Sequence, residues 1–129
     1  MLALLAKETV AAEEPVLAKH GVSMWAYIVL SALDYSAIRT QSALAEFIGA
    51  DKSRIIPTLD ELQTHRYIER IPDPDDRRAR LLNITESGRA IKNAVQAEIQ
   101  RGEERWLSQL SATDRSVFLR VLQQLTFER

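Results

Sequence analysis

The chain has 129 residues, of which 46% are hydrophobic and 27% charged, and its formal net charge is −1. These values favour one globular domain with a sizeable core over a disordered chain. The absence of cysteine excludes a disulfide framework, cysteine-ligated zinc and thiol-based redox sensing. It is also compatible with a cytoplasmic protein.

The N-terminal residues begin with a short apolar run that has no basic leader before it, and the acidic stretch AEEP follows. No segment is long and apolar enough to cross a bilayer. Four glycines and four prolines are few for this length, which favours long helices over many short strands. We therefore expect a soluble, cytoplasmic, mainly helical protein without a membrane partner.

Three helices are predicted in the first half of the chain after residue 22. The first begins at Ser23, a capping residue followed by apolar positions at spacings of three and four. The second has Thr40 as N-cap and ends at Gly49, and the third begins after a short turn with Asp51 as its cap. Two short helices joined by a tight turn form a helix-turn-helix, whose second helix typically enters the major groove of DNA.

Pro57 conflicts with the third predicted helix. It lies beyond the first turn, where the missing N–H and the ring clash cost up to about 3 kcal/mol in a regular helix. Two alternatives remain: the helix begins later than Asp51, or it is kinked at the proline.

The apolar period changes after Ile68 and predicts a two-stranded hairpin. YIERI and RLLNIT are the two strands, and the tip between them, Pro72 to Ala79, is too long for a tight turn and should project as a loop. A hairpin directly after a helix-turn-helix is a wing. Arg77, Arg78 and Arg80 lie beside its tip.

The wing arginines have two interpretations. A solvated loop is one; the other is that a wing tip reaches the minor groove beside the recognition helix, where a narrow groove attracts guanidinium groups. Asp76 precedes Arg78 by two residues and is predicted to hold its guanidinium through paired hydrogen bonds.

Two more helices are predicted after the wing. Thr85 caps a long helix with Ile91, Val95, Ile99 and Trp106 on one face. The last helix opens with the capping sequence SATD. Its apolar stripe consists of Val117, Phe118, Val121, Leu122 and Leu125. A compact winged domain cannot cover all of this surface, so part of it should contact another subunit.

The segment from Thr40 to Gly88 resembles the winged helix-turn-helix of MarR-type bacterial transcriptional regulators. ADKS and LDEL match the recognition-helix pattern of the family, and the wing matches Asp-x-Arg followed by Leu-x-hydrophobic-Thr-x-x-Gly. The wing positions are Asp76, Arg78, Leu82, Ile84, Thr85 and Gly88. The helical segments on both sides fit too, so the resemblance covers nearly the whole chain.

The resemblance implies a mainly α fold with a small β-hairpin wing, as one domain over residues 1–129. Residues 23–88 would form the winged helix-turn-helix core, and the helices in 1–20 and 89–129 would form the dimerisation region. It further implies a homodimer that binds double-stranded DNA at a pseudo-palindromic operator.

The resemblance also assigns the DNA contacts. Thr40, Gln41 and Ser42 would contact the backbone at a helix N-terminus, where free N–H groups suit phosphate. Arg78 would enter the minor groove. The remaining candidates are Lys52, Ser53, Arg54 and Thr58 on the recognition helix, facing the major groove or its phosphates, and Asp76, Arg77 and Arg80 on the wing.

Two residues depart from the family pattern. Pro57 replaces a residue that is often polar or basic, and Arg66 replaces the glycine usual before the first wing strand. A non-glycine residue at the second position carries strain if the backbone needs a positive φ.

In this family the helix that carries Met24, Trp25 and Tyr27 lines a ligand pocket between the DNA-binding and dimerisation regions, with His20 just before it. The resemblance therefore names these four residues as candidates for binding a small-molecule effector. A stripe of aromatic and methionine residues at helical spacing is more often core, and that alternative stays open.

Catalysis and metal binding find no support in the sequence. There is no Ser/His/Asp arrangement with a supporting motif, no glycine-rich phosphate loop and no metal-ligand spacing. Adjacent carboxylates, as in Glu13–Glu14 and Glu103–Glu104, diverge on a helix. We expect neither enzyme activity nor a cofactor.

The sequence thus predicts a dimeric, sequence-specific DNA-binding regulator, a repressor that an effector releases from its operator. The alternative is a winged-helix protein–protein interaction module that has lost DNA binding, because winged domains also serve as docking units. The wing discriminates between them, since a docking module has no need of Asp76 and Arg78 in this pattern.

Overall fold

The computed structural model describes residues 1–36, 38 and 40–127, so the last two residues of the predicted region 89–129 lie outside it. The described chain forms helices and one antiparallel hairpin. In order these are α1 (Leu2–His20), α2 (Met24–Tyr35), α3 (Gln41–Ile48), α4 (Lys52–Thr64), β1 (Ile68–Pro72), β2 (Arg80–Ile84), α5 (Glu86–Leu107) and α6 (Ala112–Phe127). The predicted mainly α fold with a hairpin wing is confirmed.

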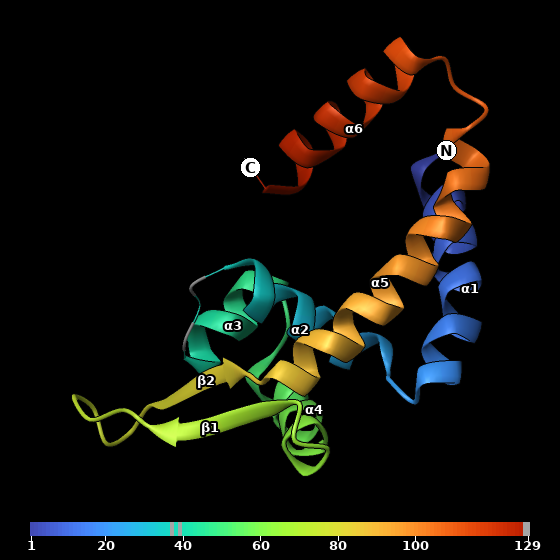
Figure 1. The fold of residues 1–129 in the computed structure, drawn as a ribbon. Coiled ribbons are helices and arrows are strands. Elements are labelled where there is room, and N and C mark those ends of the chain that lie inside the picture. The colour runs from blue at the N-terminus through green and yellow to red at the C-terminus, as the bar shows by residue number, and fades with distance from the viewer. Residues whose placement is uncertain (37, 39, 128–129) are drawn as a thin grey trace.

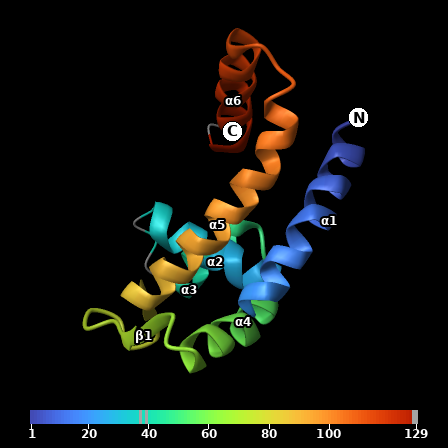
Figure 2. The ribbon, with the colours of Figure 1, turned by 45° about the vertical axis from the view of Figure 1, so that its right-hand side comes forward.

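The molecule has two parts (Figure 1). We call α2, α3, α4, the hairpin and the N-terminal half of α5 the body, and we call α1, the C-terminal half of α5 and α6 the arm. Figures 1 and 2 show α1 beside α5, whereas α6 turns back from the end of α5 and stands apart from the body.

The predicted helix starts are confirmed at the level of individual hydrogen bonds. The hydroxyl of Ser23 accepts from the N–H of Ala26 at 3.1 Å, and that of Thr40 accepts from Ala43 at 3.1 Å. Each bond satisfies a donor that the first turn of a helix leaves unpaired. Asp51 stands at the N-cap of α4 but makes no capping hydrogen bond, so the predicted role of its side chain is wrong.

α4 continues through Pro57 as one uninterrupted helix. It begins at Lys52, so the alternative of a later start is wrong. Pro57 supplies no N–H to the carbonyl one turn earlier. The side chains of Ile55, Leu59 and Leu62 are almost fully buried on the opposite side of the helix. Burying a side chain of this size contributes roughly 1.5–3 kcal/mol, so the buried face offsets the cost of the proline.

The junction between α4 and the wing is fixed by the start of α5. The hydroxyls of Thr85 and Ser87 donate to the carbonyl of Arg66 at 2.7 and 3.0 Å. Arg66 has a φ of 61°, so the condition for backbone strain at this non-glycine residue is met. A Cβ on Gly88 would lie 2.0 Å from the carbonyl oxygen of Tyr67, so only glycine fits there. The Thr-x-x-Gly part of the wing motif is therefore a packing requirement.

Most of the core lies in the body, and Leu17 of α1 and Ile99 of α5 extend it into the arm. Its fully buried side chains come from every body element and include Leu30, Leu44, Leu59, Leu62, Ile68, Leu82 and Val95. Strand register aligns Ile68 with Ile84 and Pro72 with Arg80. Along α6, by contrast, none of the described side chains is buried.

Ion pairs join α5 to α2 and α1. The Asp34 carboxylate accepts from Nε of Arg89 at 2.8 Å and also pairs with the buried Lys92. These hydrogen bonds, the one from Arg89 first, lower the pKa of Asp34. Further along α5, Glu98 pairs with two residues of α1, Lys19 at 2.8 Å and His20 at 3.1 Å. α5 thus connects body and arm.

Candidate nucleic-acid interface

Three segments that are distant in sequence meet in one concavity of about 240 Å³. They are the start of α3, the start of α4 and the end of the wing tip. The predicted DNA-binding residues that line it are Thr40, Gln41, Ser42, Lys52, Arg78 and Arg80. A bridge between Thr40 and Leu81 joins the start of α3 to β2 and holds the segments together.

The other predicted contacts lie around this concavity and do not line it. Ser53, Arg54, Asp76 and Arg77 are exposed, as a surface that meets a ligand requires. Thr58 is half-buried and lies outside the lining. The structure therefore brings together six of the predicted residues and places Thr58 apart from them.

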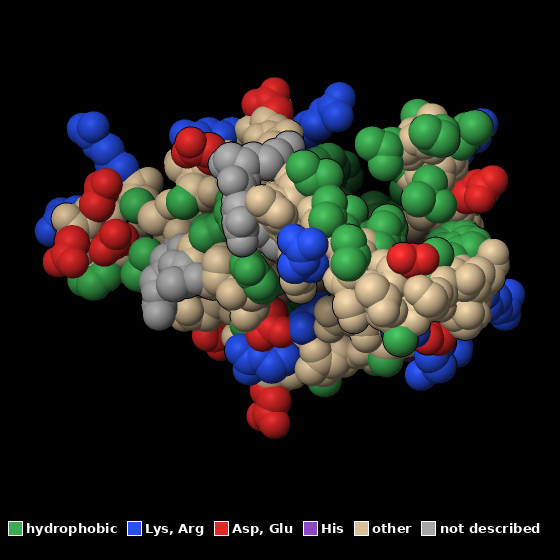
Figure 3. All heavy atoms as spheres, turned by 90° about the horizontal axis from the view of Figure 1, so that it is seen from above, with side chains coloured by type: hydrophobic (Ala, Val, Ile, Leu, Met, Phe, Trp, Pro, Cys, Tyr) green, Lys and Arg blue, Asp and Glu red, His purple; other side chains and the backbone are tan. Residues whose placement is uncertain are grey.

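The wing tip is held by its aspartates, through the backbone. The Asp73 carboxylate accepts from the N–H of Asp75 at 2.9 Å, and the Asp76 carboxylate accepts from the N–H of Arg78 at 3.0 Å. Both are local side-chain-to-backbone turns. The predicted pairing of Asp76 with the Arg78 guanidinium is wrong: within the described chain the carboxylate shapes the loop and leaves that guanidinium exposed without an ion pair. Figure 3 shows charged side chains of both signs at the wing end of the molecule, on the left.

A brace that the sequence did not reveal joins the wing to the recognition helix. Nε of Arg70 on β1 donates to the side-chain oxygen of Gln63 at 2.6 Å, and its terminal nitrogen pairs with Asp60. The Arg70 side chain is only 19% exposed, so its pairing is partly shielded from water. The signal in the sequence is an acidic residue in the second half of α4 and a basic residue in β1.

The four candidate effector residues are not brought together. His20 pairs with Glu98, Met24 packs against the core and Trp25 is 39% exposed. Tyr27 lines an open cleft of about 1100 Å³ between α2, α3, α5 and the end of α6.

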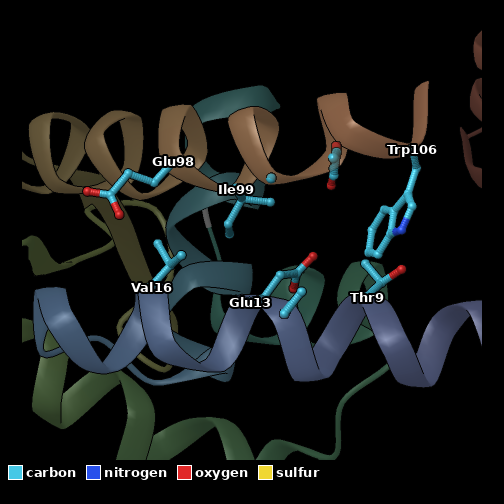
Figure 4. Close-up of a pocket in the computed structure, with 9 residues that line it drawn as sticks. Thr9, Glu13, Val16, Glu98, Ile99 and Trp106 are labelled. Atoms are coloured by element: carbon cyan, nitrogen blue, oxygen red, sulfur yellow. The ribbon is translucent and has the colours of Figure 1, made fainter. Parts of the chain in front are cut away.

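A third and much smaller cavity, of about 40 Å³, lies between α1 and α5. Figure 4 shows Glu13 reaching across from α1, with Trp106 of α5 facing Thr9 at one end. Burial raises the pKa of Glu13, and the charge of Glu103 adds to this rise; burial also raises the pKa of Glu103. Sequence reasoning compared only adjacent carboxylates and missed this approach between helices.

Among the described residues no group of histidines, cysteines and carboxylates could hold a metal ion. No single helix in this part of the chain is long and apolar enough to span a membrane; only the bent pair α1–α2 passes that test, as two pieces taken together. The fold and the concavity define a winged helix-turn-helix domain with a projecting wing and flanking helices.

Comparison with known proteins agrees with this class. The family model described as "MarR family" matches residues 20–79. A transcriptional regulator of the MarR family from a Rhodococcus species is 26% identical, has a TM-score of 0.85, and the match covers 99% of this chain and 91% of that one. CouR from Rhodococcus jostii, solved with p-coumaroyl-CoA, has a TM-score of 0.79 at 24% identity, covering 98% and 88% of the two chains.

Among curated relatives, the transcriptional repressor NicR of Pseudomonas putida is 26% identical over 99 residues, covering 77% of this chain and 63% of NicR. The matched part of this chain thus spans less than two thirds of the length of the curated relatives. The chain is thus similar to MarR-family transcriptional regulators, in sequence over the residues that the family model matches and in fold over nearly its whole length.

Proposed function

We propose that the protein is a homodimeric repressor that binds a pseudo-palindromic operator in double-stranded DNA. The observation that carries this proposal is the concavity in which the starts of two helices and the wing tip converge. A helix N-terminus favours phosphate, a recognition helix fits the major groove and a wing fits the neighbouring minor groove. All three are present on one face.

The local charge of this face suits a polyanion although the net charge of the chain is −1. Lys52, Arg78 and Arg80 line the concavity together and are all exposed. Each cation placed on a phosphate releases a counterion from DNA, so binding should weaken steeply as salt rises. DNA affinity should therefore depend on this local group of cations much more than on the net charge of the whole chain.

The apolar surface of the arm supports a homodimer. Val117, Phe118, Val121, Leu122 and Leu125 are 39–62% exposed along one helix. An apolar face of this size in water is unfavourable and marks an interaction site. A two-fold symmetric partner would cover it and would place two winged domains on two half-sites about one helical turn apart.

An effector would act through the equilibrium between two arrangements of the dimer. NicR is named a repressor and CouR was solved with a ligand, which supports both roles for this chain. A ligand that favours the arrangement with the wrong spacing of recognition helices lowers DNA affinity. His20, Met24, Trp25 and Tyr27 remain our candidates for that ligand site, and we expect the regulator to be cytoplasmic, without a cofactor.

Arg78→Ala tests the wing assignment. Loss of a groove contact of this kind costs about 1–3 kcal/mol, or about 5- to 150-fold in affinity for an operator selected from random duplex DNA. The exposed Arg101 on α5 provides the matched control, because Arg101→Ala removes the same charge far from the concavity. Unchanged operator binding by Arg78→Ala would refute the assignment.

Lys52→Ala tests the phosphate contact. It should weaken binding to all sequences alike and reduce the slope of log affinity against log salt by about 1. A wild-type protein that binds no DNA even at low salt would instead support the protein–protein interaction module.

A further inference from the structure

One residue of the concavity differs from its neighbours in chemistry. Ile56 lies on α4, lines the concavity and is 45% exposed, whereas most side chains around it are polar or cationic. The adjacent Ile55 is 3% exposed and supplies the core contact of this turn. The exposure of Ile56 therefore does not reflect a failure of α4 to pack.

Helix geometry places Ile56 in the middle of the stripe that faces the wing. Residues four apart lie on the same side of a helix, so Lys52, Ile56 and Asp60 are aligned. Lys52 supplies a cation at the start of the stripe, and Asp60 at its far end is committed to the brace with Arg70. Pro57, next to Ile56, is exposed and adds only aliphatic atoms. The middle of the DNA-facing side of α4 thus offers no hydrogen-bonding side chain.

Base edges in the major groove carry one apolar group, the C5 methyl of thymine. An aliphatic side chain packed against any other base edge would bury donors or acceptors without partners, which is unfavourable. We infer that Ile56 makes α4 read a thymine methyl group, so that each half-site of the operator has a required A·T pair opposite this residue. The inference rests on the proposed function and adds the base that the helix selects.

The test removes only the methyl group. An operator is selected from random duplex DNA with the wild-type dimer, and each thymine is replaced in turn by uracil, which keeps every hydrogen-bonding group. A buried methyl is worth about 0.8 kcal/mol, so wild-type affinity should fall about fourfold for the thymine opposite Ile56 in one half-site. With Ile56→Ala, the same replacement should leave affinity unchanged.

Ile71→Ala is the matched control. Ile71 lies on β1, is 43% exposed and does not line the concavity, so this variant should keep the full response to uracil. Thermal melting of both variants should match the wild type, because both side chains are exposed.

The outcomes separate the two claims. A wild-type protein that enriches no DNA sequence overturns the proposed function and the inference with it. A protein that binds its operator, but with no uracil-sensitive position or with equal sensitivity after Ile56→Ala, overturns the inference alone. Loss of the uracil response only in Ile56→Ala supports it.

Discussion

The body and the arm use the same residue type at the same helical spacing with opposite results. Leu59 and Leu62 of α4 are 0% and 2% exposed, whereas Leu122 and Leu125 of α6, also three residues apart, are 47% and 62% exposed. Figure 3 shows apolar side chains gathered in the half of the molecule away from the wing. The helices of the body bury their apolar faces within the chain, whereas α6 leaves its apolar face exposed, and we propose that a second chain covers it. In the proposed function, the body recognises a single half-site and the arm pairs two half-sites.

The largest effect should follow when α6 becomes polar. Leu122→Lys puts a charge in the exposed apolar stripe and should convert the proposed dimer to a monomer. Losing the second half-site should lower operator affinity by about 10² to 10⁴, the gain typical of bivalent binding. Sedimentation and DNA titration measure the two effects. Gln123→Lys adds the same charge at an exposed polar position one residue away, and an equal loss of dimer with that variant would argue against the stripe as the interface.

The next largest effect should come from the body. Gly88→Ala drives a Cβ to 2.0 Å from a backbone oxygen, which must shift, so we expect a loss of about 3 kcal/mol in the free energy of unfolding. Chemical denaturation measures it. The control is Gly102→Ala in the same helix, where a Cβ meets nothing within 4 Å and alanine should stabilise by up to about 1 kcal/mol. Equal effects of the two variants would mean that the junction is not tightly packed.

A smaller effect on DNA affinity should show whether Asp60 acts by holding the wing in position or only through its charge. Asp60→Asn removes a negative charge from the DNA-facing side, so electrostatics alone would raise DNA affinity. The brace predicts the opposite, a loss of about fivefold, because Arg70 no longer fixes the wing beside α4. Arg70→Gln should show a similar loss, and the effect of Arg78→Ala should shrink in that background. Higher affinity of Asp60→Asn would show that the brace has no positioning role.

The smallest effect concerns the seam between α1 and α5. The pKa of Glu103 is raised by burial above its ordinary value of 4.5, so its ionised form is disfavoured in the folded state. That penalty is absent below the unfolded pKa and grows as pH rises through the folded pKa. Glu103→Gln should therefore raise the Tm by a few degrees at pH 7 and by nothing near pH 4. Glu104→Gln removes a partner of Arg115 instead and should not raise the Tm. A gain for Glu103→Gln that is independent of pH would contradict this assignment.

The sequence predicted most of the body but little of what connects its elements. Capping residues such as Thr40 and Thr85 bond to the first turn of their own helix, and the burial of Leu59 follows from helical spacing. Caps and buried positions can therefore be predicted from the local sequence. The Arg70 brace depends on how the wing lies against α4, and the approach of Glu13 to Glu103 depends on how two helices pack. A periodic pattern identifies an apolar face without identifying its neighbour.

The Asp76 prediction failed for a related reason. The spacing to Arg78 was right, but an aspartate in a tight loop is closer to the backbone N–H two residues on than to the end of a long side chain. Motif spacing therefore named six residues that the fold brings to one concavity, and it assigned the partner of Asp76 wrongly. The reading of Ile56 needed the structure, because an apolar residue on a helix is predicted as core unless its exposure is known.

The most direct test of the account is the mass of the complex formed on DNA that the protein itself selects from a random duplex pool. We expect an enriched inverted repeat with half-sites about 10 base pairs apart, bound by two copies of the chain. A single copy per duplex, or a dimer that enriches no sequence at low salt, would contradict it.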